Sequence, residues 1–77
     1  ILGMTERLPT ISVREMLRVL KRLGFTQRRQ KGSHAFLSHP DGRRTVVPVH
    51  PGDLSRHVFR EILNQIEVSE DEIKDLL

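Results

Sequence analysis

The stretch with the clearest chemical potential is Lys31-Gly32-Ser33-His34, which stands just before a short apolar segment. An imidazole can gain and lose a proton near neutral pH, so His34 is a candidate general acid or base. Lys31 supplies a cation, and Gly32 lets backbone N–H groups approach a phosphate because it has no side chain. The tetrad therefore predicts a proton carrier beside a phosphate-binding site.

Arginines flank this tetrad, and most of the chain is basic. Residues 1–60 contain 12 lysines and arginines and four acidic residues, which gives a net charge of +8. Residues 61–77 contain one lysine and six acidic residues, which gives a net charge of −5. A body this basic attracts polyanions, most commonly nucleic acid. We therefore expect the phosphate contacts to come from Arg28, Arg29, Lys31, Gly32, Ser33, Arg43 and Arg44.

Capping signals and periodicity predict the elements that must position these residues. Ser12 and Glu15 have capping-box spacing ahead of an apolar stripe, and Ser69 and Glu72 repeat that spacing. A His-Pro-Asp-Gly turn over residues 39–42 separates two strand-like segments. The prediction is a helix over 12–23, strands over 25–31, 33–38 and 44–48, a helix from 54 or 55 to 66, and a short acidic helix ending near 77.

The order of these elements predicts an α+β fold. Consecutive strands joined by tight turns pair antiparallel, so the three strands should form one antiparallel sheet. Two amphipathic helices would cover one face of that sheet and leave the other open, which is a two-layer sandwich. We expect a single domain over residues 4–77, with residues 1–3, which precede Met4, extraneous to it.

Strand alternation predicts which residues share a face with the candidate histidine. His34, Phe36 and Ser38 fall on one face of their strand, and Ala35 and Leu37 fall on the other. Each face carries an apolar residue, so the pattern leaves open which one meets the helices. On a solvent-facing side, Phe36 could stack on a base, although the hydrophobic core is the more common place for such a ring.

Three further histidines have different expected roles. His39 lies in a turn, which we expect it to stabilise. His50 follows a Val-Pro-Val run and is a candidate second proton carrier. His57 begins the second long helix, and we expect it at the surface.

Composition argues against several other classes of protein and site. The chain has no cysteine, which rules out disulfides and thiolate zinc sites, and its histidines lack helical metal-ligand spacing. The basic body has few clustered carboxylates for magnesium, so we expect a metal-independent mechanism without a cofactor. No apolar run approaches the ~20 residues of a membrane span and no secretory signal is visible, so we expect a cytoplasmic protein with no membrane partner.

The segment Gly24–Leu54, GFTQRRQKGSHAFLSHPDGRRTVVPVHPGDL, and the later FREILNQ, Phe59–Gln65, resemble the HicA toxins of type II toxin–antitoxin systems. The resemblance implies a double-stranded-RNA-binding-domain-like fold. It also implies a ribosome-independent endoribonuclease that cleaves mRNA and arrests translation, and a HicB antitoxin partner that covers the site. The family's catalytic histidine falls on His34 and its glycine on Gly32.

Three positions depart from the family pattern. His57 stands where the family commonly has a glycine before the second helix, and Ile66-Glu67 stands where that helix commonly ends in Ala-Gly. Ala35 follows the histidine where the family often has a polar residue. The first two concern helix ends, and the third concerns how firmly RNA is held.

Two other functions fit the same basic surface. A non-catalytic module could bind double-stranded RNA through phosphates and 2′-hydroxyls. A protein-interaction domain could carry its charge incidentally. The histidine separates these alternatives from an endonuclease, because a pure binder needs cations at that place and no acid–base group.

Overall fold

The computed structural model describes residues 8–77 of the 77-residue chain, and the expectations about residues 1–3 and Met4 lie outside this range. The predicted order of elements is confirmed, with small shifts at their ends. The elements are α1 (Val13–Arg22), β1 (Thr26–Lys31), β2 (His34–Ser38), β3 (Arg44–Pro48), α2 (Arg56–Ile66) and α3 (Glu70–Leu76).

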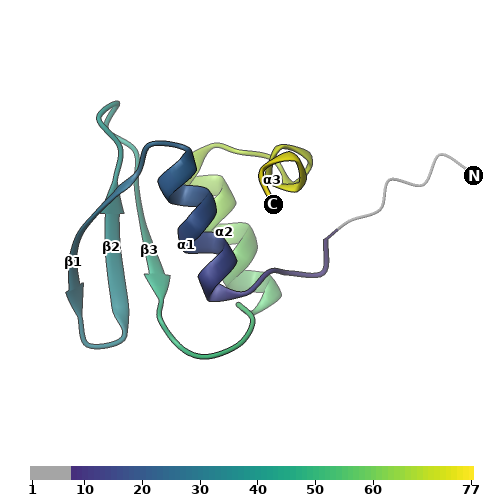
Figure 1. Cartoon of the computed structure of the whole chain (residues 1–77), viewed down its shortest axis with the longest axis horizontal. Coiled ribbons are helices and arrows are strands. Elements are labelled where there is room, and N and C mark those ends of the chain that lie inside the picture. Colours follow the sequence, from purple (N-terminus) through teal and green to yellow (C-terminus); the bar gives the residue numbers. More distant parts are fainter. Residues whose placement is uncertain (1–7) are drawn as a thin grey trace, which may run out of the picture.

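The three strands form one open antiparallel sheet in the order β1-β2-β3. Helices α1 and α2 lie side by side against one face of this sheet, and α3 lies beyond them, away from the strands (Figure 1). The α+β two-layer fold is therefore confirmed. The second face of the sheet carries no helix in the described part of the chain.

Side-chain caps define where the helices begin. The Ser12 hydroxyl accepts a hydrogen bond from the Glu15 backbone N–H, and the Glu15 carboxylate accepts one from the Ser12 backbone N–H. Ser69 and Glu72 form the same reciprocal pair at the start of α3. Both capping boxes predicted from the sequence are confirmed.

The core settles which face of β2 meets the helices. Ala35 and Leu37 are buried, together with Thr45 and Val47 of β3, and all four point toward the helices. On that side they meet a continuous set of buried residues from both long helices, including Met16, Val19, Leu20, Phe59, Ile62, Leu63 and Ile66. Burying these side chains is the main stabilising contribution to the fold.

His34, Phe36 and Ser38 consequently lie on the open face. The interpretation that Phe36 packs in the core is wrong, because its ring is only half-buried and lies outside the core cluster. Two apolar residues on opposite faces of one short strand cannot both reach the helices. Ala35 and Leu37 face the helices, where Val47 and the helical side chains pack against them.

Candidate active site

A tight hairpin places His34 next to Lys31. Gly32 and Ser33 alone connect β1 to β2, and Lys31 and His34 are direct partners in the antiparallel register. Gly32 has a φ of +59°, the conformation that glycine supplies at the first position of such two-residue turns. Directly paired side chains leave the sheet on the same face, with Cβ atoms about 4.5–5.5 Å apart. The exposed imidazole and the exposed ammonium group are therefore neighbours.

The hairpin leaves backbone accessible beside the histidine. A Cβ built on Gly32 would meet no atom within 4 Å, so the space in front of this residue is open. Ala35, the position where the family often has a polar residue, is fully buried on the helix side. The departure at Ala35 thus falls on the opposite face of the strand from His34.

His50 lies at the same end of the sheet as His34. Pro48 of β3 pairs with His34, and the Val49 backbone N–H donates to the Ser33 carbonyl at 2.6 Å, which ties the start of the β3–α2 loop to the hairpin. Figure 1 shows the β1–β2 turn and this loop at one end of the molecule. The exposed His50 ring has Nδ1 at 3.0 Å from the Pro51 carbonyl, so a proton on Nδ1 leaves Nε2 as an acceptor.

A β-bulge in β1 brings two consecutive arginines to the open face. The register passes from Gln27 opposite Leu37 to Arg29 opposite Phe36, so Arg28 is an extra residue. The Arg28 Nε donates to the Ser38 hydroxyl at 3.1 Å, and the Arg29 guanidinium lies 4.9 Å from the centre of the Phe36 ring. Strict alternation would have separated these arginines. This bulge cannot be predicted from the sequence, because the strand is entirely polar and shows no alternation of apolar residues.

A shallow hollow of about 300 Å³ lies beside this pair of arginines. Phe36 and Val46 are partners in neighbouring strands, and so are Ser38 and Arg44. Arg44 therefore contributes a third guanidinium to the open face. The residues around the hollow are Arg28, Arg29, Phe36, Leu37, Ser38, Arg44, Thr45 and Val46.

Arg43 lies apart from these three arginines. Its Nε donates to the Asp41 carboxylate at 2.8 Å, its Nη1 donates to the Ile66 carbonyl, and its guanidinium lies 5.2 Å from the centre of the Phe25 ring. The Arg43 backbone N–H, helped by the guanidinium, holds the pKa of the Asp41 carboxyl below its usual range. Arg43 thus joins the β2–β3 turn to the end of α2.

The two remaining histidines occupy the places expected for them. The His39 ring has Nε2 at 3.1 Å from the Leu23 carbonyl and accepts a hydrogen bond from the Asp41 backbone N–H at Nδ1, so it holds the turn to the end of α1. His57 is exposed, with Nε2 at 3.5 Å from the Glu61 carboxylate one helical turn away. Both interpretations are confirmed.

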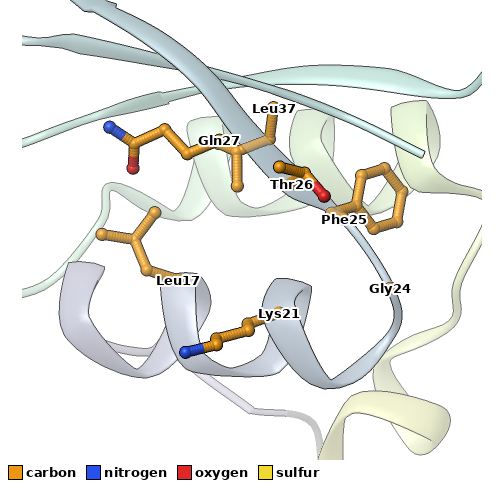
Figure 2. A pocket seen from close by; sticks show the side chains of 7 residues that line it. All are labelled: Leu17, Lys21, Gly24, Phe25, Thr26, Gln27 and Leu37. Atoms are coloured by element: carbon orange, nitrogen blue, oxygen red, sulfur yellow. The ribbon is translucent and has the colours of Figure 1, made fainter.

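A second hollow, of about 500 Å³, lies between α1 and β1 on the helix side of the sheet. Figure 2 shows Leu17 and Lys21 on α1 facing the segment that carries Thr26 and Gln27. No histidine or carboxylate is among its lining residues. This hollow is separated from His34 by the sheet, so it is not part of the candidate site.

The ionisable groups of residues 8–77 also bear on metal binding. Across this range, no three histidine, aspartate or glutamate side chains are grouped so that they could hold a metal ion.

No helix over the same residues has the length and apolar character needed to cross a membrane.

A family model described as the HicA toxin of bacterial toxin–antitoxin systems matches residues 13–68. The match runs from the first residue of α1 to just past α2 and includes the hairpin and the bulged strand. The chain belongs to the HicA toxin family. The resemblance stated from the sequence is thereby confirmed. Comparison with curated proteins finds no significant match.

Proposed function

We propose that this HicA-family chain is an endoribonuclease that cleaves mRNA in the cytoplasm without a metal ion, with His34 as its acid–base group. The observation that carries the proposal is the direct pairing of the exposed His34 with Lys31 across an open glycine turn. The family membership supports a toxin role, and cutting mRNA would arrest translation.

The chemistry uses the nucleophile that RNA already contains. The 2′-oxygen attacks the adjacent phosphorus, the bond from phosphorus to the 5′-oxygen breaks, and the first product ends in a 2′,3′-cyclic phosphate. One proton leaves the 2′-hydroxyl and one joins the departing 5′-oxygen. Lys31 and backbone N–H groups near Gly32 stabilise the extra negative charge on the phosphoryl oxygens, and His34 moves one of the protons.

The second proton transfer is assigned to His50. A single step that removes one proton and delivers another needs both a base and an acid, unless water serves as one of them. His50 supports this assignment by its place at the His34 end of the sheet and by the orientation of its ring. When Nδ1 donates to the Pro51 carbonyl, Nε2 is free to accept a proton.

RNA would follow the arginines across the open face. Arg28, Arg29 and Arg44 surround one hollow, and Lys31 continues the positive charge toward His34. Phosphate contacts of this kind position the substrate and contribute most of its affinity. A HicB-like antitoxin is proposed to cover the same face, where acidic groups on the partner would meet the arginines.

The test is incubation of the purified chain with a defined RNA in the presence of a chelator. We expect cleavage that resists the chelator and fragments that carry 2′,3′-cyclic phosphate ends. Cleavage that disappears with the chelator would contradict the metal-independent mechanism. Tight RNA binding without any cleavage would instead support a non-catalytic RNA-binding module.

A further inference from the structure

The ring of Phe36 lies on the solvent side of the sheet and has no place in the core. It is half-buried, and the side chains that face it are Arg29 on one neighbouring strand and Val46 on the other. The Arg29 guanidinium lies 4.9 Å from the ring centre, which is within the range of a cation–π contact. An aromatic ring beside a guanidinium plane offers two flat surfaces on which a base can stack.

The surroundings of the ring add contacts for a phosphate. The hollow of about 300 Å³ has Phe36 and Val46 as apolar surface, and Arg28 and Arg44 carry positive charge at its border. Arg28 is held in place by its hydrogen bond to the Ser38 hydroxyl, 3.1 Å long. A ligand that fits has a flat, largely apolar part and a negatively charged part, which describes a nucleotide.

The position of the hollow relative to His34 ties it to the cleavage chemistry. His34 and Phe36 are two residues apart on β2 and point to the same face, so their Cα atoms are separated by about 6.6 Å. One nucleotide of an extended RNA strand covers a comparable length. A strand with its reacting phosphate at His34 would therefore bring a neighbouring base to Phe36.

We infer that Arg28, Arg29, Phe36 and Val46 form a nucleobase subsite next to the cleaved phosphate. The inference rests on the proposed function and adds a substrate requirement to it. A base can enter this hollow only after it leaves a helix, so the RNA must be unpaired beside the cleaved bond. Stacking accepts every base, so the subsite selects single strands more than sequences.

An abasic scan tests the subsite. A set of single-stranded RNAs with one known cleavage site would carry one abasic nucleotide at each position around the cleaved bond. We expect the wild-type chain to cut poorly only when the abasic nucleotide is immediately beside that bond, by about 5- to 150-fold, the factor equivalent to one stacked base. Uniform cutting of all the RNAs would overturn the inference.

Matched variants link that penalty to the ring. Phe36→Leu keeps an apolar side chain without an aromatic face, and Phe36→Tyr keeps the face. The abasic penalty should disappear in Phe36→Leu and persist in Phe36→Tyr. A penalty of the same size in Phe36→Leu would place the base elsewhere. Circular dichroism melts check that the variants fold. If Phe36→Leu does not fold, the abasic scan of the wild-type chain still tests the subsite.

Binding measurements separate this inference from the proposed cleavage. The His34→Ala chain should bind the intact RNA more tightly than the RNA with the neighbouring abasic nucleotide, whether or not His34 is the acid–base group. Equal binding of the two RNAs would overturn the subsite and leave the assignment of His34 untouched. Loss of antitoxin binding in Phe36→Leu, with RNA binding unchanged, would assign the hollow to the protein partner instead.

Discussion

At the residue scale, Lys31 and His34 form one cross-strand pair, and we propose separable roles for them. Lys31→Ala should weaken RNA binding and make the plot of log affinity against log salt shallower by about 0.7, the value for one phosphate contact on a single strand. His34→Ala should change affinity and slope less, because the role proposed for this residue is proton transfer and not a phosphate contact. Fluorescence anisotropy over a salt series measures both quantities.

Lys21→Ala is the matched control for this prediction. Lys21 is an exposed lysine on α1, beside the hollow on the helix side of the sheet. Its removal changes the net charge of the chain as much as Lys31→Ala does. A slope that changes equally in both variants would show that net charge alone is responsible, and would contradict a local contact at Lys31.

The departure from the family at the end of α2 has a measurable consequence. Glu67 has a φ of +59° and a ψ of +44°, the left-handed conformation that a glycine adopts freely and that costs other residues about 1 kcal/mol or more. Glu67→Gly should therefore raise the free energy of unfolding by about 1 kcal/mol, as measured by urea denaturation. Glu61→Gly, at an exposed position within the same helix, should lower it by about 1 kcal/mol. A less stable Glu67→Gly chain would contradict the assigned conformation.

At the element scale, the sequence predicts what depends on local patterns. Caps fix the starts of α1 and α3, and turn residues separate the strands, so the order of elements follows from composition and spacing alone. The sequence does not predict which face of β2 meets the helices, because Phe36 gives one face an apolar residue and Leu37 gives one to the other. The decision comes from packing against β3 and the helices, which is a tertiary contribution.

The bulge in β1 escapes prediction for a related reason. Every residue of Thr26–Lys31 is exposed, so no buried face imposes a register that the sequence could reveal. The site depends on this element, because the bulge puts Arg28 and Arg29 on one face. The sequence predicts a tight connection after Lys31, but with the second strand starting at Ser33; the structure starts β2 one residue later, and the two-residue turn then pairs His34 with Lys31.

The capping box of α1 predicts how stability responds to acid. Hydrogen bonds from the Ser12 backbone N–H and then from its hydroxyl lower the pKa of the Glu15 carboxyl in the folded chain. Because the pKa of Glu15 is lower in the folded chain, its ionised carboxylate stabilises the fold at pH values above the pKa of an unfolded glutamate, about 4.3. This contribution is lost as the pH falls through the pKa of Glu15 in the folded chain. The free energy of unfolding should therefore drop between about pH 7 and about pH 3, and drop less in Glu15→Gln. Equal losses in the two chains, measured by urea denaturation, would contradict this.

At the scale of the whole molecule, the charged residues of the three strands are all basic, whereas the helices carry residues of both signs. The helices cover one face of the sheet (Figure 1). The open face carries Arg28, Arg29 and Arg44 together with His34. Five of the six acidic residues of 61–77 belong to α2 and α3, and the sixth, Glu67, follows the last residue of α2. The same helices also carry basic residues, among them Arg60 and Lys74. A partner that blocks the site should therefore bind the open face.

Hydrogen exchange on the complex with a HicB-like antitoxin tests where that partner binds. We expect slowed exchange over residues 31–38, which form the hairpin turn and β2, relative to the chain alone. The amides around α3 should exchange as before. Slowed exchange confined to residues 69–77 would contradict masking of the open face.

The most direct test of the central claim is the single-turnover rate at which the His34→Ala chain cleaves a defined RNA. We expect a fall of about 10²- to 10⁴-fold, the loss typical of a missing acid–base group, with RNA affinity retained. His57→Ala removes an exposed histidine from the helix side and should cut at the wild-type rate. A folded His34→Ala chain that cuts as fast as the wild type would remove His34 from the mechanism.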